Sequence, residues 1–150
     1  MDYIQLQSYI REQFSLADLE PAAYSPLTLA YIGDSIYDLV IKTVIIGRGN
    51  CPANKLHKKA SALVRAEAQA KIADFLWDIL TEAEQGIYKR GRNAKSYTMA
   101  KNASVTDYRK ATGLEALVGY LYLANQTERV IELLRLGIEH YEGGNHDADI

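Results

Sequence analysis

The sequence predicts an all-α protein consisting of one domain. Its 150 residues are 48% hydrophobic and 24% charged, which suits one globular domain with a sizeable core. Apolar residues recur at helical spacing in almost every long segment, and helix-start signals precede several of these segments. No segment alternates apolar and polar residues over a length that would form a strand. We therefore expect a helical bundle spanning residues 1–150.

The first half of the chain predicts three or four helices. Residues 3–14 form a short amphipathic stretch. Further along, "PAAYSP" is a region that breaks helical structure. Ser25 followed by Pro26 is a favourable helix start, because the hydroxyl can cap the helix and proline suits its first position. That helix should end at the glycines of residues 47–49. The segment "KLHKKASALVRAEAQAKIADFLWDIL" then predicts one or two helices rich in Ala and Leu.

The second half predicts three more helices. "TEAE" places Glu84 three residues after Thr81, a capping box that should open a helix ending near "RGRN". "NAKSYTMAKNAS" lacks periodicity and is expected to be a loop. Long helices are expected over residues 104–124 and 127–141, and the C-terminal tail, residues 142–150, is expected to fray.

Composition excludes several classes of protein. No segment reaches the ~20 apolar residues that cross a bilayer, so we expect no membrane partner. The start "MDYIQLQSYIREQF" lacks the basic residues and apolar run of a secretion signal, so we expect a cytoplasmic protein. Cys51 is the single cysteine, which excludes an internal disulfide and a cysteine-built zinc site. Three histidines also make a histidine-rich metal centre a poor interpretation.

Positive charge is concentrated in one segment of an acidic chain. The net charge is −2, yet residues 89–110 carry +6 and the remaining 128 residues carry −8. The cations of this segment are Lys89, Arg90, Arg92, Lys95, Lys101, Arg109 and Lys110. Such a segment is either a local patch for a polyanion or a solvated loop, and charge alone does not distinguish the two.

Two predicted helices each combine an acid with a glycine in apolar surroundings. The first, "YIGDSIYD", contains Gly33 and Asp34; the second, "TGLEALVGYLYL", contains Glu115 with Gly119 one turn away. Glycine inside a helix costs ~1 kcal/mol relative to alanine, and close helix–helix packing is the natural compensation. If the helices cross at these glycines, the two carboxylates meet, and they repel unless a proton or a cation lies between them. Oxygen ligands alone favour a hard cation such as Mg²⁺ or Mn²⁺.

A structural interpretation of these acids stays open at this point. A single acid on a long helix is usually solvated or paired with a lysine or arginine. Asp38, for example, lies four residues before Lys42 and can form an ion pair with it. Perturbed acids mark functional sites only statistically, so spacing alone does not decide.

At these residues the sequence resembles a known family. "LAYIGDSIYDLV" resembles the signature helix of the ribonuclease III catalytic domain, and "TGLEALVGYLYL" resembles the second acidic helix of that family. The segments "NKLHKKASALVRAEAQA" and "YKRGRNAKSYTMAKNASVTDYRKATGLEAL" resemble its shorter branch, Mini-ribonuclease III. That branch has the catalytic domain without the double-stranded-RNA-binding domain. The resemblance covers roughly residues 25–125.

The resemblance implies a fold and a metal site. It implies the helical bundle of the ribonuclease III catalytic domain, with Asp34 and Glu115 as the metal-holding catalytic acids. The implied cofactor is Mg²⁺, for which Mn²⁺ would substitute. Full-length members carry glutamates where this chain has Leu27 and Ala30, and an aspartate where it has Thr112, so the number of metal ions stays open.

The implied activity is metal-assisted hydrolysis of phosphodiester bonds in double-stranded RNA. Proteins grip duplex RNA through its phosphates, 2′-hydroxyls and shape, and cations interspersed with amides suit such contacts. The candidate RNA-binding residues are Lys89, Arg90, Arg92, Asn93, Lys95, Lys101 and Arg109. The resemblance further implies a homodimer, whose two sites would face opposite strands, and the large-subunit (23S) ribosomal RNA precursor as substrate. A ribosomal protein could present that substrate. Apolar helices, including the stretches "LVIKTVII" and "LVGYLYLA", leave enough hydrophobic face for such an interface, and the sequence leaves open which face forms it.

Two other functions compete with this interpretation. A non-catalytic RNA-binding or ribosome-associated protein of the same fold would have little reason to keep both Asp34 and Glu115. A helical DNA-binding regulator is disfavoured by the acidic remainder of the chain and by the lack of a clear helix-turn-helix pattern.

Overall fold

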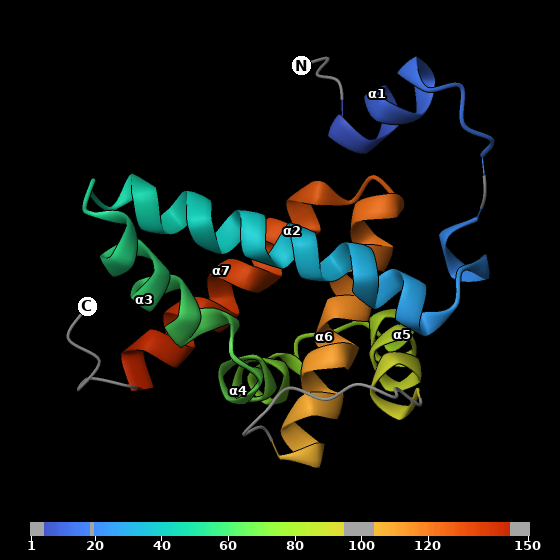
Figure 1. The fold of residues 1–150 in the computed structure, drawn as a ribbon. Helices are drawn as coiled ribbons and strands as arrows, with labels where there is room; N and C mark the ends of the chain where they lie inside the picture. The colour runs from blue at the N-terminus through green and yellow to red at the C-terminus, as the bar shows by residue number, and fades with distance from the viewer. Residues whose placement is uncertain (1–4, 19, 95–103, 145–150) are drawn as a thin grey trace.

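The computed structural model describes residues 5–18, 20–94 and 104–144, and all regular structure within these ranges is helical (Figure 1). The fold class predicted from the sequence is therefore confirmed. The elements are α1 (Leu6–Gln13), a 3-10 turn (Pro21–Ala23), α2 (Pro26–Gly47), α3 (Ala53–Val64), α4 (Ala66–Leu76), α5 (Glu82–Asn93), α6 (Val105–Leu123) and α7 (Thr127–Gly144).

The predicted helix starts are capped as the sequence indicates. The Ser25 hydroxyl accepts a hydrogen bond from the Thr28 amide (3.2 Å) at the start of α2. At α5 the capping box is complete: the Thr81 hydroxyl accepts from the Glu84 amide, and the Glu84 carboxylate accepts from the Thr81 amide. These side chains satisfy backbone donors that a helix leaves free at its first turn.

Two boundaries are set by features that local patterns did not reveal. The long Ala- and Leu-rich segment is two helices, because Arg65 adopts an extended conformation between α3 and α4. Helix α7 continues to Gly144, so the prediction that the chain frays from residue 142 is wrong for residues 142–144. Glu142 is ion-paired with Arg48 (2.7 Å), which ties the last turn of α7 to the end of α2. Residues 145–150 lie outside the described residues.

Helix α6 is the centre of the bundle. Helix α2 crosses it, α4 and α5 lie on either side of it, and α7 packs against α4 (Figure 1). Leu114, Leu117 and Leu121 of α6 are almost completely buried and form part of one hydrophobic core with residues of α2, α4 and α7. The stretch "LVGYLYLA" is mostly part of this core, and its remaining residues are half-buried. Among the described helices, none combines the length and apolar character needed to span a membrane.

Candidate active site

Helices α2 and α6 cross at the two glycines that the sequence singled out. A Cβ added at Gly33 would lie 1.7 Å from the Glu115 carbonyl oxygen, and one added at Gly119 would lie 1.9 Å from the Leu29 carbonyl oxygen. Neither position can hold a side chain unless the helices separate. The glycines thus allow backbone-to-backbone contact, as predicted.

This crossing brings the Asp34 and Glu115 carboxyl groups together. Asp34 directly follows Gly33, and its carboxyl group interacts with Glu115 both as a hydrogen-bond partner and as a charge. Glu115 is half-buried but Asp34 is exposed, so the apolar surroundings expected around both acids do not enclose Asp34. The physical reason is rotation along the helix: Gly33 faces α6, and the next residue is turned about 100° toward the rim of the contact. The pair therefore has one carboxyl group, that of Glu115, partly enclosed by the protein, and another, that of Asp34, open to solvent.

The proximity of the two acids perturbs Glu115. Burial, and after it the charge of Asp34 and a hydrogen bond with Asp34, raises the pKa of Glu115 to about 8. The side-chain amide of Gln69 acts in the opposite direction and lowers this pKa. Within the described ranges, no lysine, arginine or histidine forms an ion pair with either carboxyl group.

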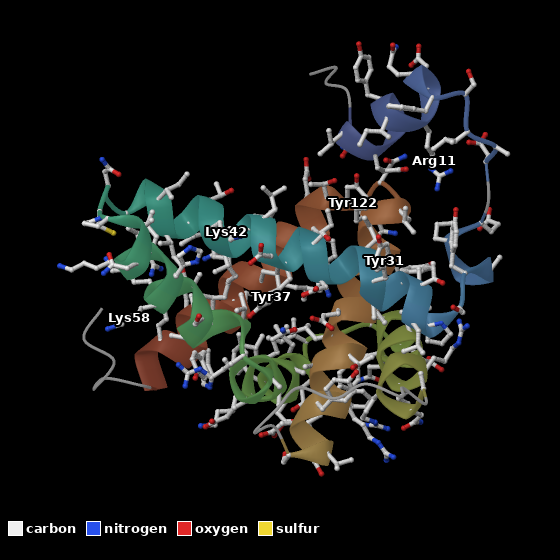
Figure 2. All side chains as sticks on the ribbon, in the orientation of Figure 1. Arg11, Tyr31, Tyr37, Lys42, Lys58 and Tyr122 are labelled. Carbon is white, nitrogen blue, oxygen red and sulfur yellow. The ribbon has the colours of Figure 1, made fainter. Side chains whose placement is uncertain are left out.

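Two further side chains, which sequence reasoning missed, surround the pair. Gln69 of α4 is 3% exposed, and its Nε2 lies 3.4 Å from Glu115 Oε2. Tyr37 extends from α2 toward the underlying helices, and its hydroxyl donates to the Leu63 carbonyl oxygen (2.6 Å; Figure 2). Burial, with a smaller contribution from Glu115, raises the pKa of Tyr37. A signal for Gln69 does exist in the sequence: it occupies the first position of the apolar stripe continued by Ile72, Ala73 and Leu76.

The composition of this site fits a hard divalent cation with a mostly non-protein coordination shell. Asp34 and Glu115 contribute carboxyl oxygens, and Gln69 Oε1 beside them is a buried acceptor to which none of the described residues donates a hydrogen bond. No cluster of three or more Asp, Glu, His or Cys side chains occurs among the residues that the structure describes. Mg²⁺ keeps several waters and is commonly held by one or two carboxylates together with substrate phosphates, so two carboxylates are sufficient.

The basic end of α5 packs against the turns of α6 that carry Glu115. The backbone of Gly91 packs against α6, where an added Cβ would be 2.6 Å from Ala116 Cβ and 3.0 Å from Gly113 Cα. The last turn of α5 is thereby held at the level of Glu115 on α6. The predicted RNA-binding residues placed near this end of α5 or on the first turns of α6 are Lys89, Arg90, Arg92, Asn93 and Arg109. All are exposed except Arg92, which is half-buried. Lys95 and Lys101 lie outside the described residues.

Aromatic rings support two of these cations. Lys89 Nζ lies 5.3 Å from the centre of the Trp77 ring, and the Arg92 guanidinium lies 5.6 Å from that of Tyr88. Such contacts hold a cation at the surface without neutralising it. By contrast, Lys110 is ion-paired with Asp74 (2.9 Å), so its charge is already compensated.

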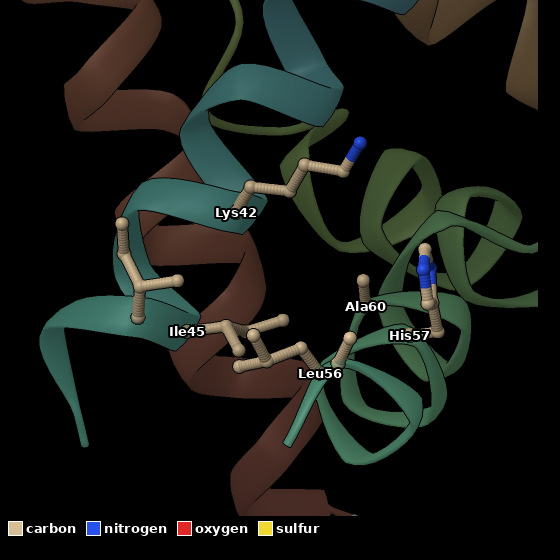
Figure 3. Close-up of a pocket in the computed structure, with 7 residues that line it drawn as sticks. Lys42, Ile45, Leu56, His57 and Ala60 are labelled. Atoms are coloured by element: carbon tan, nitrogen blue, oxygen red, sulfur yellow. The ribbon is translucent and has the colours of Figure 1, made fainter. Parts of the chain in front are cut away.

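Two other polar residues, Asp38 and His57, have a structural partner or a position away from the pair. Asp38 forms the predicted ion pair with Lys42 (2.9 Å). His57 is exposed and lines an apolar pocket between α2 and α3, with Ile45, Leu56 and Ala60 as its walls (Figure 3). Ile45 lies eleven residues beyond Asp34 on α2, roughly 16 Å along the helix axis. The pocket is thus separate from the acid pair.

Comparison with known proteins agrees with this geometry. The chain matches the family described as "Ribonuclease III domain" over residues 27–126, which contain both acids of the pair. This defines the class: the protein is an endoribonuclease of the ribonuclease III type.

More similar relatives narrow the assignment. The chain is 46% identical over 147 residues to the Mini-ribonuclease 3 of Clostridium tetani, covering 93% of this chain and 96% of the relative. It is 51% identical over 110 residues to the Mini-ribonuclease 3 of Enterococcus faecalis, covering 72% and 83% respectively. A crystal structure of a Fusobacterium nucleatum protein superposes with a TM-score of 0.74 at 30% identity, covering 81% of this chain and 99% of that protein. The chain belongs to the Mini-ribonuclease 3 family.

Proposed function

We propose that the chain is a Mg²⁺-dependent endoribonuclease that cleaves double-stranded RNA at the Asp34–Glu115 pair. The observation that carries the proposal is this meeting of two acids from helices in backbone contact, with no cation paired to either within the described ranges. An uncompensated acid pair lowers stability, so its presence indicates a role in binding or chemistry.

Asp34 and Glu115 would act as ligands rather than as general bases. When bound, Mg²⁺ (or Mn²⁺ in its place) supplies a water of lowered pKa as nucleophile and stabilises charge on the phosphate oxygens. Asp34, on the exposed side of the pair, can be reached by a phosphodiester in solution, whereas half-buried Glu115 fixes the inner side of the site. Gly33 and Gly119 hold the two ligands in register by fixing the distance between their helices.

The exposed cations around the end of α5 would hold the RNA backbone. Duplex RNA presents phosphates and 2′-hydroxyls rather than readable base edges, so a basic surface next to the acid pair suits it. Lys89, Arg90, Arg92, Asn93 and Arg109 are the described residues proposed for this contact. Lys95 and Lys101, which lie outside the described residues, complete the proposed set.

A two-fold homodimer would let two sites act on opposite strands. Leu27 and Tyr31, separated by one turn of α2, are both exposed, and Tyr31 is 80% exposed despite its size (Figure 2). Because Asp34 follows within one further turn, a second copy packed on these residues would lie next to the active site. In the cell, the proposed substrate is the precursor of 23S ribosomal RNA in the cytoplasm, with a ribosomal protein as a possible presenting partner.

The experiment that tests the function compares Asp34→Asn with Asp38→Asn on a duplex RNA substrate. Asp34→Asn should lower cleavage by at least about 100-fold, because it removes one of two charged ligands. Asp38 lies one turn later on the same helix and is ion-paired with Lys42, so Asp38→Asn should retain cleavage within a few-fold. EDTA should stop the wild-type reaction and added Mg²⁺ should restore it. Wild-type turnover by Asp34→Asn, or cleavage indifferent to EDTA, would refute the proposal.

A further inference from the structure

Gln69 connects the acid pair to the junction between α3 and α4. It lies on the first turns of α4, and its Nε2 donates a hydrogen bond to the Val64 carbonyl oxygen (2.9 Å) and faces Glu115 Oε2 (3.4 Å). Val64 is the last residue of α3, where helical carbonyl groups have no partner within their own helix. The side-chain amide of Gln69 thus joins the end of α3 to the proposed metal ligand Glu115, which lies 46 residues after Gln69 in the chain.

The chemistry of the neighbours fixes which way this amide points. The Val64 carbonyl oxygen can only accept a hydrogen bond, so the NH₂ group of Gln69, and not its amide oxygen, must face it, and the same group lies toward Glu115 Oε2. The opposite orientation would set three oxygen atoms against one another. Gln69 therefore meets Glu115 as a donor.

The junction to which Gln69 is anchored is itself held from α2. The buried hydroxyl of Tyr37 donates to the Leu63 carbonyl oxygen (2.6 Å), next to the carbonyl that Gln69 binds. Tyr37 lies three residues after Asp34 on α2. The helices that carry Asp34 and Gln69 are consequently tied to adjacent carbonyl groups, so the donor facing Glu115 is fixed relative to the other acid.

The hydrogen bond to the Val64 carbonyl explains one end of the Gln69 amide, but not its buried oxygen. Gln69 is 3% exposed, and its Oε1 is buried without a hydrogen-bond partner among the described residues. An unsatisfied buried polar atom costs roughly 1–3 kcal/mol, and native proteins keep such atoms where another role compensates for them. An aliphatic residue would suit the apolar stripe and avoid that cost, although it would leave the Val64 carbonyl oxygen without the Gln69 donor.

We propose that Gln69 is a positioning residue for Glu115. Anchored on Val64, its amide holds one carboxylate oxygen of Glu115 and so fixes the rotation of that carboxylate relative to Asp34. This inference rests on the proposed function, because it assumes that the pair binds a divalent cation. Ligand-orienting groups of this kind change metal affinity or activity by about 10–100-fold when removed.

The test compares Gln69→Leu with a matched control, Gln7→Leu. Gln7 is also buried (7% exposed), and its Nε2 likewise donates to a backbone carbonyl, that of Leu123 (3.0 Å), but it does not contact the pair. Titration calorimetry with Mg²⁺ alone, on protein without RNA, gives the metal affinity, and duplex-RNA kinetics separate kcat from KM. Gln69→Leu should weaken Mg²⁺ binding and lower kcat at fixed Mg²⁺ by about 10-fold, with KM for RNA unchanged. Gln7→Leu should lower the unfolding temperature and leave both values unchanged.

Each outcome decides the inference. Mg²⁺ affinity and kcat of Gln69→Leu within twofold of wild type overturn it, as does a loss that Gln7→Leu shows equally. If Gln69→Leu does not fold, Gln69→Met, which keeps the length of the side chain without its donors, takes its place under the same criteria. A wild-type protein that neither binds Mg²⁺ nor cleaves duplex RNA would refute the proposed function itself, whereas an active wild type with an unaffected Gln69→Leu refutes only the role of Gln69.

Discussion

Two glutamates on neighbouring helices, Glu84 buried and Glu115 half-buried, have opposite environments. Glu84 of α5 is 6% exposed; its carboxylate accepts hydrogen bonds from Arg129 Nε and Nη2 (both 2.8 Å) and from the Thr81 amide (2.9 Å). Glu115 of α6 has another acid, Asp34, as its charged neighbour and the Gln69 amide as its donor. The hydrogen bonds from Arg129 lead the causes that lower the pKa of Glu84, whereas burial and Asp34 raise that of Glu115.

The comparison separates a structural acid from a functional one. A buried carboxylate is tolerated when cations and donors replace its hydration, as they do at Glu84. At Glu115 this replacement is incomplete, so the folded protein keeps an unfavourable arrangement that a bound cation would relieve. Burial by itself therefore does not distinguish the two roles, but the identity of the partner does.

Replacing each glutamate by glutamine tests the comparison most directly. Glu115→Gln should lower duplex-RNA cleavage by at least about 100-fold, because a neutral amide is a poor ligand for a hard cation. In metal-free buffer it should leave the free energy of unfolding unchanged or higher, since repulsion with Asp34 is removed. Glu84→Gln should do the reverse: retain cleavage within about twofold and lose roughly 1–3 kcal/mol of stability, because Arg129 loses the more buried of its two charge partners, Glu84 and Glu132.

Urea unfolding in metal-free buffer and single-turnover cleavage on the same preparations measure both quantities. A Glu115→Gln variant that is destabilised as much as Glu84→Gln would show that the pair is structural. Loss of cleavage in a folded Glu84→Gln variant would show that Glu84 is also needed for activity, so the two glutamates would not differ in role.

The backbone contact that creates the Glu115 environment is tested by Gly33→Ala. The new Cβ would lie 1.7 Å from the Glu115 carbonyl oxygen, so α2 and α6 must separate. We expect a loss of about 3 kcal/mol in stability, the upper part of the usual range for overpacking, together with loss of cleavage as the carboxyl groups move apart.

Gly86→Ala is the matched control, because a Cβ at Gly86 of α5 meets no atom within 4 Å. There alanine should raise stability by up to ~1 kcal/mol through its higher helix propensity and leave cleavage unchanged. Thermal unfolding and a cleavage assay of both variants suffice. A Gly33→Ala protein as stable and active as Gly86→Ala would contradict the close crossing.

The sequence was sufficient to predict that α2 and α6 cross, but not to predict the environment of the two acids. The caps at Ser25 and Thr81 are local, so they located two helix starts. Gly33 and Gly119 each cost helix stability, and this local anomaly revealed the contact between α2 and α6. The exposure of Asp34 depends on how far its helix is rotated against α6, which a single-helix pattern does not contain.

The partners of the two glutamates were even harder to predict from local sequence patterns, because they are distant along the chain. Arg129 is 45 residues from Glu84, and Gln69 is 46 residues from Glu115. Periodicity indicates which face of a helix is buried, but not which residue of another helix meets it. Gln69 was detectable only as a polar residue in an apolar stripe, which marks an unusual position without naming its partner.

The pH dependence of the free energy of unfolding sharpens the comparison, because the two glutamates contribute to it with slopes of opposite sign. The unfolded chain titrates glutamate near pH ~4.3. The pKa of Glu84 is lowered in the folded state, so its contribution is complete above that value and is lost as the pH falls further. The pKa of Glu115 is about 8 in the folded state, so between pH ~4.5 and 8 the folded protein holds the extra proton and loses stability as the pH rises.

Metal-free wild-type protein should therefore lose roughly 1–3 kcal/mol between pH 5 and pH 8 through Glu115, measured by urea unfolding at several pH values. Glu115→Gln should flatten this decline, because glutamine does not titrate, whereas Glu84→Gln should keep it and lower the whole curve. If the stability of Glu115→Gln declines with pH at the wild-type slope, another group holds the extra proton of the folded protein. The two glutamates then do not differ as described. With saturating Mg²⁺ the wild-type decline should also shrink, since a cation that binds the ionised pair stabilises the folded state most where that pair is ionised.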